Sequence, residues 1–254
     1  MTGYTPPIRL FVDTDLDTGM TVTLDKDQAH YLGHVMRRSA GDHIELFNGR
    51  TDSMIAELAE LGRKSARLDI KKICSTYQQS PDIWFSFAPV KRTRLDFMAQ
   101  KATELGARKI QPVNTEYCQV SRVNLERLHA NAVEAAEQTG RLDVPEIGPF
   151  VSLDDMLANW PSDRHLLFCD ETLSGEASSN PVRQLMAEPV KKAGLLIGPE
   201  GGFSSDERDR IRQMPLVRAL SLGPRILRSD TAALAALSLF QAVCGDWSVS
   251  RFHK

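Results

Sequence analysis

The stretch LLIGPEGGFSSDE, residues 195–207, joins a run of apolar residues to a glycine-rich turn. The apolar run predicts a buried strand that ends near Gly198-Pro199. Ser204 and Glu207 form an S-x-x-E capping box, which predicts that a helix begins directly after the turn. A strand, a loop and a helix in this order are typical of the carboxyl edge of a parallel sheet, where ligands bind. Taken alone, the stretch indicates a structural turn as well as it indicates a binding loop.

A second stretch, LGPRILRSDTAALAAL at residues 222–237, repeats the order of strand, Gly-Pro, loop and helix. Ser229 or Asp230 is the predicted N-cap of its helix. The loop carries Arg225 and Arg228, separated by an Ile-Leu pair (226–227) that we expect to face the core. Arginine beside glycine at the end of a strand favours an anionic or nucleic-acid ligand. Neither stretch contains GxGxxG or a P-loop, so these two common nucleotide motifs are excluded.

The rest of the C-terminal part alternates strands with helices. Strands are predicted at 83–90, 109–114, 165–170, 193–199 and 217–223, and helices at 94–106, 124–140, about 205–214 and 230–244. Gly106 and Gly140 are expected at the C′ positions of the first two helices. This rhythm predicts an α/β fold with a mostly parallel sheet covered on both faces.

The N-terminal part reads as short strands that alternate apolar and polar residues, at 8–12, 20–24, 43–49, 53–61 and 66–73. One helix is predicted at about 26–38, with Asp25 or Asp27 as its N-cap. These elements indicate a small β-barrel. The polar stretch at 75–82 resembles a linker, so the predicted organisation is a barrel at 1–74, a linker at 75–82 and an α/β domain at 83–254.

Composition narrows the class of protein. The chain has 254 residues, of which 42% are hydrophobic and 25% charged, as is ordinary for a soluble globular protein. The N-terminal stretch lacks the basic start and apolar run of a signal peptide, and the longest apolar-rich segment, 232–244, is too short to span a bilayer, so a cytoplasmic protein is expected. The four scattered cysteines predict neither a disulfide framework nor a metal site. The net charge of −2 gives no global sign of nucleic-acid binding.

The two Gly-Pro stretches together resemble the SPOUT methyltransferases, which use S-adenosylmethionine and whose C-terminal chain is tied into a trefoil knot. The most similar of these is the family that methylates N3 of a uridine in small-subunit (16S) ribosomal RNA. HYLGHVMRRSAGDHIELFNG (30–49) resembles that family's PUA-like barrel, and KATELGARKIQPV (101–113) and AAEQTGRLDVPEI (135–147) resemble its central motifs. The family usually has Thr-Glu where this chain has Ser229-Asp230, so no role of that glutamate is carried over to Asp230.

The resemblance implies that knot loops hold S-adenosylmethionine through their backbone. The implied contacts are Ile197, Gly198, Pro199, Gly201, Gly202, Leu222, Gly223, Ile226, Leu227 and Arg228, with Leu222, Ile226 and Leu227 walling the adenine. A third loop, CDETLSG (169–175), is expected to border the same pocket. Superfamily members usually form homodimers through the knot region, and the apolar helix at 231–243 is a candidate for that surface, burial within the monomer being the alternative.

Three charged residues are the catalytic candidates. Arg225 and Arg228 are expected to hold the target base or its phosphate. Glu200 is a candidate for orienting the substrate or for accepting the N3 proton. The alternative for Glu200 is a carboxylate bonded to backbone amides within its own loop.

The partner implied is ribosomal RNA or the small ribosomal subunit. On the predicted helix at 26–38, His30, His34 and Arg38 follow one another at i, i+4 and i+8, with Arg37 beside them, as a basic stripe or simply a solvated face. A zinc pair is rejected, because no glutamate follows His30. The other candidate RNA contacts are Arg9, Lys91, Arg92, Lys101, Gln138 and Arg141. The rival interpretations are a non-catalytic RNA-binding protein and a phosphate- or nucleotide-binding enzyme that uses helix N-termini.

Overall fold

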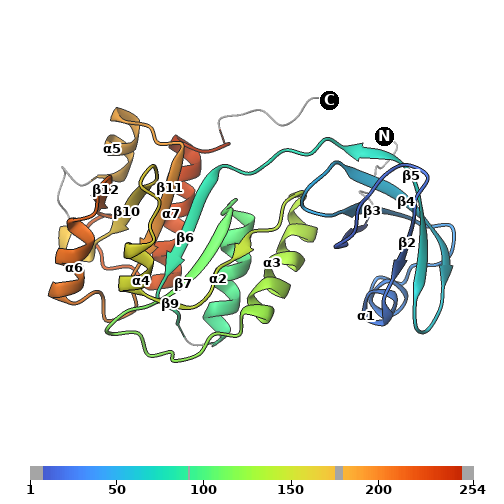
Figure 1. The fold of residues 1–254 in the computed structure, drawn as a ribbon, viewed down its shortest axis with the longest axis horizontal. Helices are drawn as coiled ribbons and strands as arrows, with labels where there is room; N and C mark the ends of the chain where they lie inside the picture. The colour runs from blue at the N-terminus through green and yellow to red at the C-terminus, as the bar shows by residue number, and fades with distance from the viewer. Residues whose placement is uncertain (1–7, 91, 175–179, 248–254) are drawn as a thin grey trace. The chain divides into compact units, whose positions relative to one another are not determined.

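The computed structural model describes residues 8–90, 92–174 and 180–247 (Figure 1). The chain divides into two compact units. One holds the described residues of 1–79 together with Ala136–Asp143, and the other holds those of 80–135 and 144–254. The predicted linker lies between strand β5 (Ala66–Ser75) and strand β6 (Asp82–Phe87). The domain boundaries at 74 and 83 stay a prediction.

The first unit is built on a five-stranded sheet. Strands β1 (Ile8–Phe11), β2 (Thr21–Leu24), β3 (His43–Phe47) and β4 (Ser53–Leu61) join β5 in the order β1-β3-β4-β5-β2. The β1–β3 pair is parallel and the other pairs are antiparallel. Register shifts interrupt the long β4–β5 ladder, and such bulges bend a sheet. Leu24, Ile44, Leu46, Leu58 and Leu68 form the centre of its core.

The helix predicted at 26–38 ends at Val35, three residues earlier than predicted, and changes type within its length. Helix α1 (Lys26–His30) begins at the predicted cap Asp25, whose carboxylate accepts the N–H of Gln28 at 2.9 Å. The chain then continues as a π-helical turn, η1 (Tyr31–Val35), and Arg37 adopts a left-handed backbone with φ of 54°. Because the helix ends before position 38, Arg38 does not continue the helical stripe of His30 and His34.

The second unit contains the parallel sheet that the strand-helix rhythm predicts. Its strands include β7 (Lys109–Asn114), β8 (Glu146–Ile147), β10 (His165–Cys169), β11 (Lys192–Ile197) and β12 (Val217–Leu220). They follow the order β12-β10-β11-β6-β7-β8, and a short strand, β9 (Val151–Ser152), also pairs with β7. Every pair is parallel. The trefoil knot stays an implication of the resemblance.

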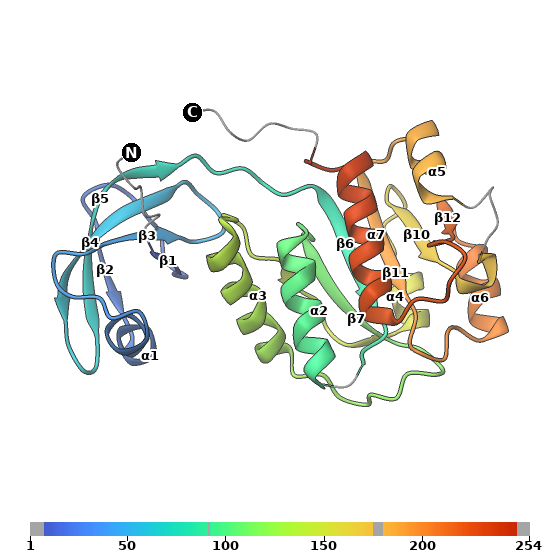
Figure 2. The ribbon, with the colours of Figure 1, turned by 180° about the vertical axis from the view of Figure 1, so that it is seen from behind.

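Helices cover both faces of this sheet (Figures 1 and 2). On one face, α2 (Arg92–Glu104), α3 (Leu125–Thr139), α5 (Pro181–Ala187) and α7 (Ser229–Val243) pack against inward residues such as Leu195 and Ile197. On the other face, α4 (Leu153–Ala158) and α6 (Ser205–Arg212) pack against residues such as Leu196. The alternation along β11 therefore places apolar side chains on both faces, as a buried parallel strand requires.

The termini of three helices test the predicted capping residues: two predictions are confirmed and one is wrong. Gly106 and Gly140 follow α2 and α3 with φ of 79° and 76°, the left-handed conformation expected at C′. Helix α7 is different, because its N-cap is Arg228 and no side chain caps it. Ser229, a predicted cap, instead donates from its hydroxyl to the carbonyl of Gly198 at 3.0 Å. Its side chain therefore joins two loops and does not cap the N-terminus of α7.

Glu207 fixes the end of the glycine-rich turn. The predicted capping box is present, with the N–H of Ser204 bonding to the Glu207 carboxylate at 3.0 Å and the N–H of Glu207 bonding to Ser204 Oγ. The second carboxylate oxygen of Glu207 accepts the N–H of Glu116 at 2.8 Å, from the loop after β7. Glu207 is only 3% exposed, so it connects two loops inside the protein.

No helix among the described residues is long and apolar enough to cross a membrane.

We expect Glu207→Ala to lower the free energy of unfolding by about 2–4 kcal/mol, because a cap is lost and buried N–H groups lose their acceptor. Urea denaturation followed by circular dichroism measures the change. Asp206→Ala, an exposed position in the same helical turn, is the matched control and should change it by less than about 0.5 kcal/mol. Equal effects at the two positions would show that Glu207 has no special structural part.

Candidate active site

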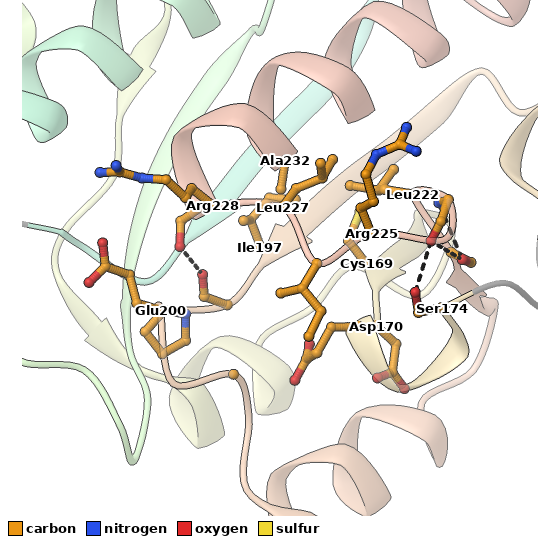
Figure 3. Close-up of a pocket in the computed structure, with 18 of the residues that line it drawn as sticks. Cys169, Asp170, Ser174, Ile197, Glu200, Leu222, Arg225, Leu227, Arg228 and Ala232 are labelled. Carbon is orange, nitrogen blue, oxygen red and sulfur yellow. Dashed lines mark hydrogen bonds between the residues drawn. The ribbon is translucent and has the colours of Figure 1, made fainter.

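A pocket with a volume of about 430 Å³ opens at the carboxyl ends of the three neighbouring strands β10, β11 and β12 (Figure 3). Loops far apart in the sequence meet there, because parallel strands end at the same edge of a sheet. The lining residues are Arg94, Cys169, Asp170, Glu171, Ser174, Ile197, Gly198, Pro199, Glu200, Gly202, Leu220, Ser221, Leu222, Gly223, Arg225, Ile226, Leu227, Arg228, Ser229 and Ala232.

Hydrogen bonds to backbone carbonyls hold the loops together. Ser229 Oγ bonds to the Gly198 carbonyl at 3.0 Å, which joins the loops after β11 and β12. Ser174 Oγ bonds to the Gly223 carbonyl at 3.1 Å, which joins the loops after β10 and β12. Gly223 has φ of 106°, which a residue with a side chain rarely adopts, so glycine is required there for backbone reasons. Two of the pocket's own lining residues, Ser174 and Ser229, thus hold the backbone of its walls in place.

The loop after β10 borders the pocket, as the sequence predicts, and a buried carboxylate shapes it. Asp170 caps the 3-10 turn η2 (Glu171–Leu173), accepting the N–H of Thr172 at 3.0 Å. It also forms an ion pair with Arg212 at 2.6 Å, and its own N–H bonds to the Leu220 carbonyl at 3.0 Å. Glu171 is paired with Arg208 of α6. These acidic groups therefore hold the loop in position.

Most of the residues proposed to contact a cofactor lie on this pocket. Ile197, Gly198, Pro199, Gly202, Leu222, Gly223, Ile226, Leu227 and Arg228 all line it. Gly201 does not, and it lies instead in a smaller hollow beside the pocket. The expectation that Ile226 faces the core is wrong, since its side chain is 81% exposed at the pocket, while Leu227 packs against the core.

The three catalytic candidates, Glu200, Arg225 and Arg228, also line the pocket. Glu200 forms an ion pair with Arg94, from the first turn of α2. Asp230 lies 4.0 Å from Arg94 Nε and 3.9 Å from Arg228 Nε, so it stands between the two arginines. Figure 3 shows Glu200 and Arg228 on one side of the pocket and Arg225 on the other.

Arg94 is a site residue that sequence reasoning missed. The sequence places it only in a basic run between Trp84 and Lys109. Its partner Glu200 is far along the chain, and the pairing arises because α2 follows β6, which lies next to β11 in the sheet. No local spacing rule indicates such a contact.

In the first unit, two residues proposed to bind RNA are occupied internally. Arg9 donates to the carbonyls of Ala136 and Arg141 at 2.6 and 2.8 Å and pairs with Glu45 at 3.2 Å. Arg141 is buried and pairs with Asp143 at 2.8 Å. Burial lowers the pKa of Arg9, against the opposing effect of Glu45. These contacts give both arginines a structural part, which corrects the expectation that they face RNA.

The other proposed RNA contacts are placed as follows. His30 and His34 are exposed, with their rings stacked at 4.6 Å, and Arg37 is exposed beside them. Arg38 is half-buried and Gln138 is exposed. Lys101 pairs with Glu104 at 2.6 Å. Lys91 and the side chain of Arg92 lie outside the described residues.

Comparison with known proteins identifies the family. A family model described as an RNA methyltransferase domain matches residues 78–241, and one described as an RNA methyltransferase PUA domain matches residues 24–71. The chain belongs to the RNA methyltransferase family. In the sequence of this RNA methyltransferase, the two matches meet close to the end of β5 in the first sheet and the start of β6 in the second.

Relatives of this RNA methyltransferase are similar over nearly their whole length. Ribosomal RNA small subunit methyltransferase E from Rickettsia conorii is 29% identical over 91% of this chain and 93% of its own. A crystal structure of the Neisseria gonorrhoeae protein of that name, bound to S-adenosyl methionine, matches with a TM-score of 0.86 and 30% identity over 95% of this chain and 100% of that one. A putative methyltransferase from Legionella pneumophila in complex with the cofactor SAM matches with a TM-score of 0.83 and 30% identity, with the same coverage.

Cys169 is the one cysteine among the described residues that line the pocket. Its surroundings keep the thiol protonated. It is 8% exposed. Burial raises the pKa of the Cys169 thiol from 9.0 to about 12, and the neighbouring Asp170 carboxylate adds to the rise. A thiol in this state does not act as a nucleophile near neutral pH. Among the described residues, no group of three or more His, Cys, Asp or Glu side chains is arranged to hold a metal ion.

We expect Cys169 to resist iodoacetamide at pH 8 in the folded protein, whereas the half-buried Cys74 is alkylated. Peptide mass spectrometry after brief labelling, with and without urea, measures both thiols. The pKa of the Cys169 thiol is higher in the folded than in the unfolded protein. Its contribution to the free energy of unfolding is therefore fully present below about pH 9 and is lost as the pH rises toward 12. Equal labelling of the two thiols in the folded protein would contradict the assignment.

Proposed function

We propose that this RNA methyltransferase transfers the methyl group of S-adenosylmethionine to N3 of a uridine in 16S ribosomal RNA. The observation that carries the proposal is the pocket at the ends of β10, β11 and β12, which is walled by backbone and carries arginines at its mouth. Two similar structures hold S-adenosylmethionine, and several relatives are named for the small ribosomal subunit.

The pocket suits this cofactor in size and lining. Its volume of about 430 Å³ falls within the range of small-molecule sites, roughly 300–1,000 Å³. Leu222, Ile226 and Leu227 offer apolar surface to an adenine ring, and the chain at Gly223 offers backbone groups with no Cβ between them and a ligand. When bound, S-adenosylmethionine supplies an activated methyl carbon on a positively charged sulfur, which leaves as a neutral thioether.

The charged residues supply what the acceptor needs. N3 of uridine loses its proton as it gains the methyl group, so an acceptor for that proton is required. The Glu200 carboxylate is the candidate, and Arg94 holds it at the mouth of the pocket. Arg228 and Arg225 can stabilise the uridine anion or hold a neighbouring phosphate. Most of the acceleration then comes from alignment of N3 with the methyl carbon.

N3 lies on the base-pairing edge, so the uridine has to be unpaired or flipped out. The exposed basic residues His30, His34 and Arg37 are candidates for binding RNA away from the target uridine.

We further propose a homodimer that acts in the cytoplasm on the small ribosomal subunit. In α7, residues such as Ala233, Leu237 and Phe240 are buried within the unit, so the apolar face of this helix is used internally and the dimer surface has to include other residues. Light scattering at micromolar concentration tests the pairing, and a fully active monomer would contradict it.

We expect Gly223→Val to weaken binding of S-adenosylmethionine by about tenfold or more, because a side chain would stand between cofactor and backbone. Titration calorimetry measures the affinity. Gly41→Val is the matched control, since Gly41 has a similar φ of 93° and open space around it but belongs to the first unit. Unchanged affinity in a folded Gly223→Val protein would contradict the placement of the cofactor.

We expect Arg228→Ala to lower kcat for methyl transfer by about 100-fold or more while most of the cofactor affinity is kept, because its guanidinium is assigned to the substrate. The assay uses labelled S-adenosylmethionine and small subunits from a strain that lacks the enzyme, followed by nucleoside analysis. Arg183→Ala, an exposed arginine of α5 outside the pocket, is the control and should keep full activity. Label on another base, on ribose or on protein would show that the substrate assignment is wrong.

A further inference from the structure

Four charged side chains from three separate elements meet at the mouth of the pocket. Glu200 lies on the turn after β11, Arg94 in the first turn of α2, and Arg228 and Asp230 at the start of α7. Glu200 pairs with Arg94. Asp230 Oδ2 lies 4.0 Å from Arg94 Nε, and Asp230 Oδ1 lies 3.9 Å from Arg228 Nε. The four charges are therefore linked in the order Glu200, Arg94, Asp230, Arg228.

Exposure divides the linked charges into an outer and an inner pair. The side chains of Glu200 and Arg228 are 53% and 58% exposed, whereas those of Arg94 and Asp230 are 37% and 20% exposed. The outer pair is thus the more open to a substrate. Asp230 does not line the pocket, although both of its arginine neighbours do. We therefore expect Asp230 to act through these neighbours and not by touching the ligand.

Asp230 is fixed in place by its own helix. Its carboxylate accepts the N–H of Thr231 at 2.8 Å. It also lies in the first turn of α7, where the helix dipole favours a negative charge. The residue before it, Ser229, bonds to the carbonyl of Gly198 and so ties this helical turn to the loop after β11. The inner carboxylate is thus held by backbone groups as well as by the arginines.

The turn that carries Glu200 is also supported from its other side. A Cβ at Gly201 would come within 3.2 Å of Tyr117 Cβ, tighter than ordinary packing, so the glycine lets Tyr117 pack directly against the turn. With the backbone supported in this way, the remaining freedom of Glu200 lies in its side chain. Arg94 holds that side chain at its carboxylate.

The proposed reaction needs Glu200 and Arg228 in a fixed relation to each other. One is assigned to accept the N3 proton and the other to hold the substrate anion or phosphate, so both have to reach the same nucleotide. Two exposed, flexible side chains lose conformational freedom when they are brought together on one ligand. Arg94 and Asp230 reduce that cost, because each of them is already paired on both sides.

We propose that Asp230 and Arg94 are positioning residues of the methyl-transfer reaction, which hold the proton acceptor Glu200 and the substrate-binding Arg228 in one arrangement. The inference rests on the proposed function, which assigns the outer two residues to the substrate. Partly exposed ion pairs contribute little to stability, so the effect of Asp230 should be seen in catalysis and not in folding. Misalignment of reacting groups, in contrast, can lower a rate by about 100-fold.

Removal of the charge on Asp230 without a change of shape tests this. Asp230→Asn should lower kcat for methyl transfer to small subunits by roughly 10- to 100-fold. The KM for subunits and the calorimetric affinity for S-adenosylmethionine should stay within about threefold, because Asp230 does not line the pocket. The melting temperature should shift by no more than about 4 °C. Asp230→Glu restores the charge and should recover kcat to within about threefold of the unaltered protein.

Asp154→Asn is the matched control and should keep full activity. Asp154 is also an acidic residue in the first turn of a helix, α4, and it pairs with Arg210 at 2.9 Å outside the pocket. A double variant tests whether the two inner residues act together. In the Arg94→Ala protein, Asp230→Asn should lower kcat by a smaller factor than it does in the unaltered protein. Equal factors in the two backgrounds would contradict the linkage.

The outcomes separate the two proposals. If the unaltered protein does not methylate N3 of uridine in small subunits, the proposed function fails, and this inference with it. If it does, and Asp230→Asn keeps its kcat, only the positioning role is overturned. A fall in cofactor affinity or melting temperature that accounts for the lost activity would overturn that role too, because Asp230 would then support the cofactor site or the fold. Asp230→Glu as impaired as Asp230→Asn would also contradict it, since the restored charge would have no effect.

Discussion

The site depends on the parallel sheet, which brings the ends of β10, β11 and β12 to one edge, where the hydrogen bond from Ser229 Oγ to the carbonyl of Gly198 joins two of the loops. This bond joins the turn after β11 to the start of α7, and the pocket lies between them. A single bond of this kind contributes only about 1 kcal/mol, so it cannot hold the loops alone. It acts together with the sheet and with Ser174, which fixes Gly223. The glycines would allow these loops many backbone conformations, but the sheet and the two serine hydrogen bonds give the loops one defined shape.

The same edge explains how charge is arranged. Glu200 extends from a turn with little side-chain bulk, and its charge is met by Arg94 from α2. Asp230 lies between Arg94 and Arg228, so two cations and two carboxylates alternate at the mouth of the pocket. Such partly exposed pairs contribute little to stability. Their value lies in placing charge where a nucleotide and its phosphate would approach, and in keeping Glu200 between the pocket and the hollow beside it.

Local sequence patterns predicted much of this fold because they depend on neighbouring residues. The capping box of Ser204 and Glu207 and the glycines after α2 and α3 are local signals, and they appear as expected. Helices α4 and α5 were not predicted, since both are short and carry few apolar repeats. The residues lining the pocket were largely predicted through the Gly-Pro motifs and the family resemblance. The ion pair of Arg94, the placement of Gly201 against Tyr117 and the internal contacts of Arg9 depend on residues distant in the chain, which no local pattern reveals.

The central claim is that the loops after β11 and β12 hold S-adenosylmethionine through their backbone. A crystal structure with the demethylated product, S-adenosylhomocysteine, tests this most directly. We expect the product between the turn at Gly198 and the loop from Leu222 to Arg228, with backbone groups of both loops within hydrogen-bonding distance. Product bound elsewhere on a protein whose pocket remains open would contradict the account.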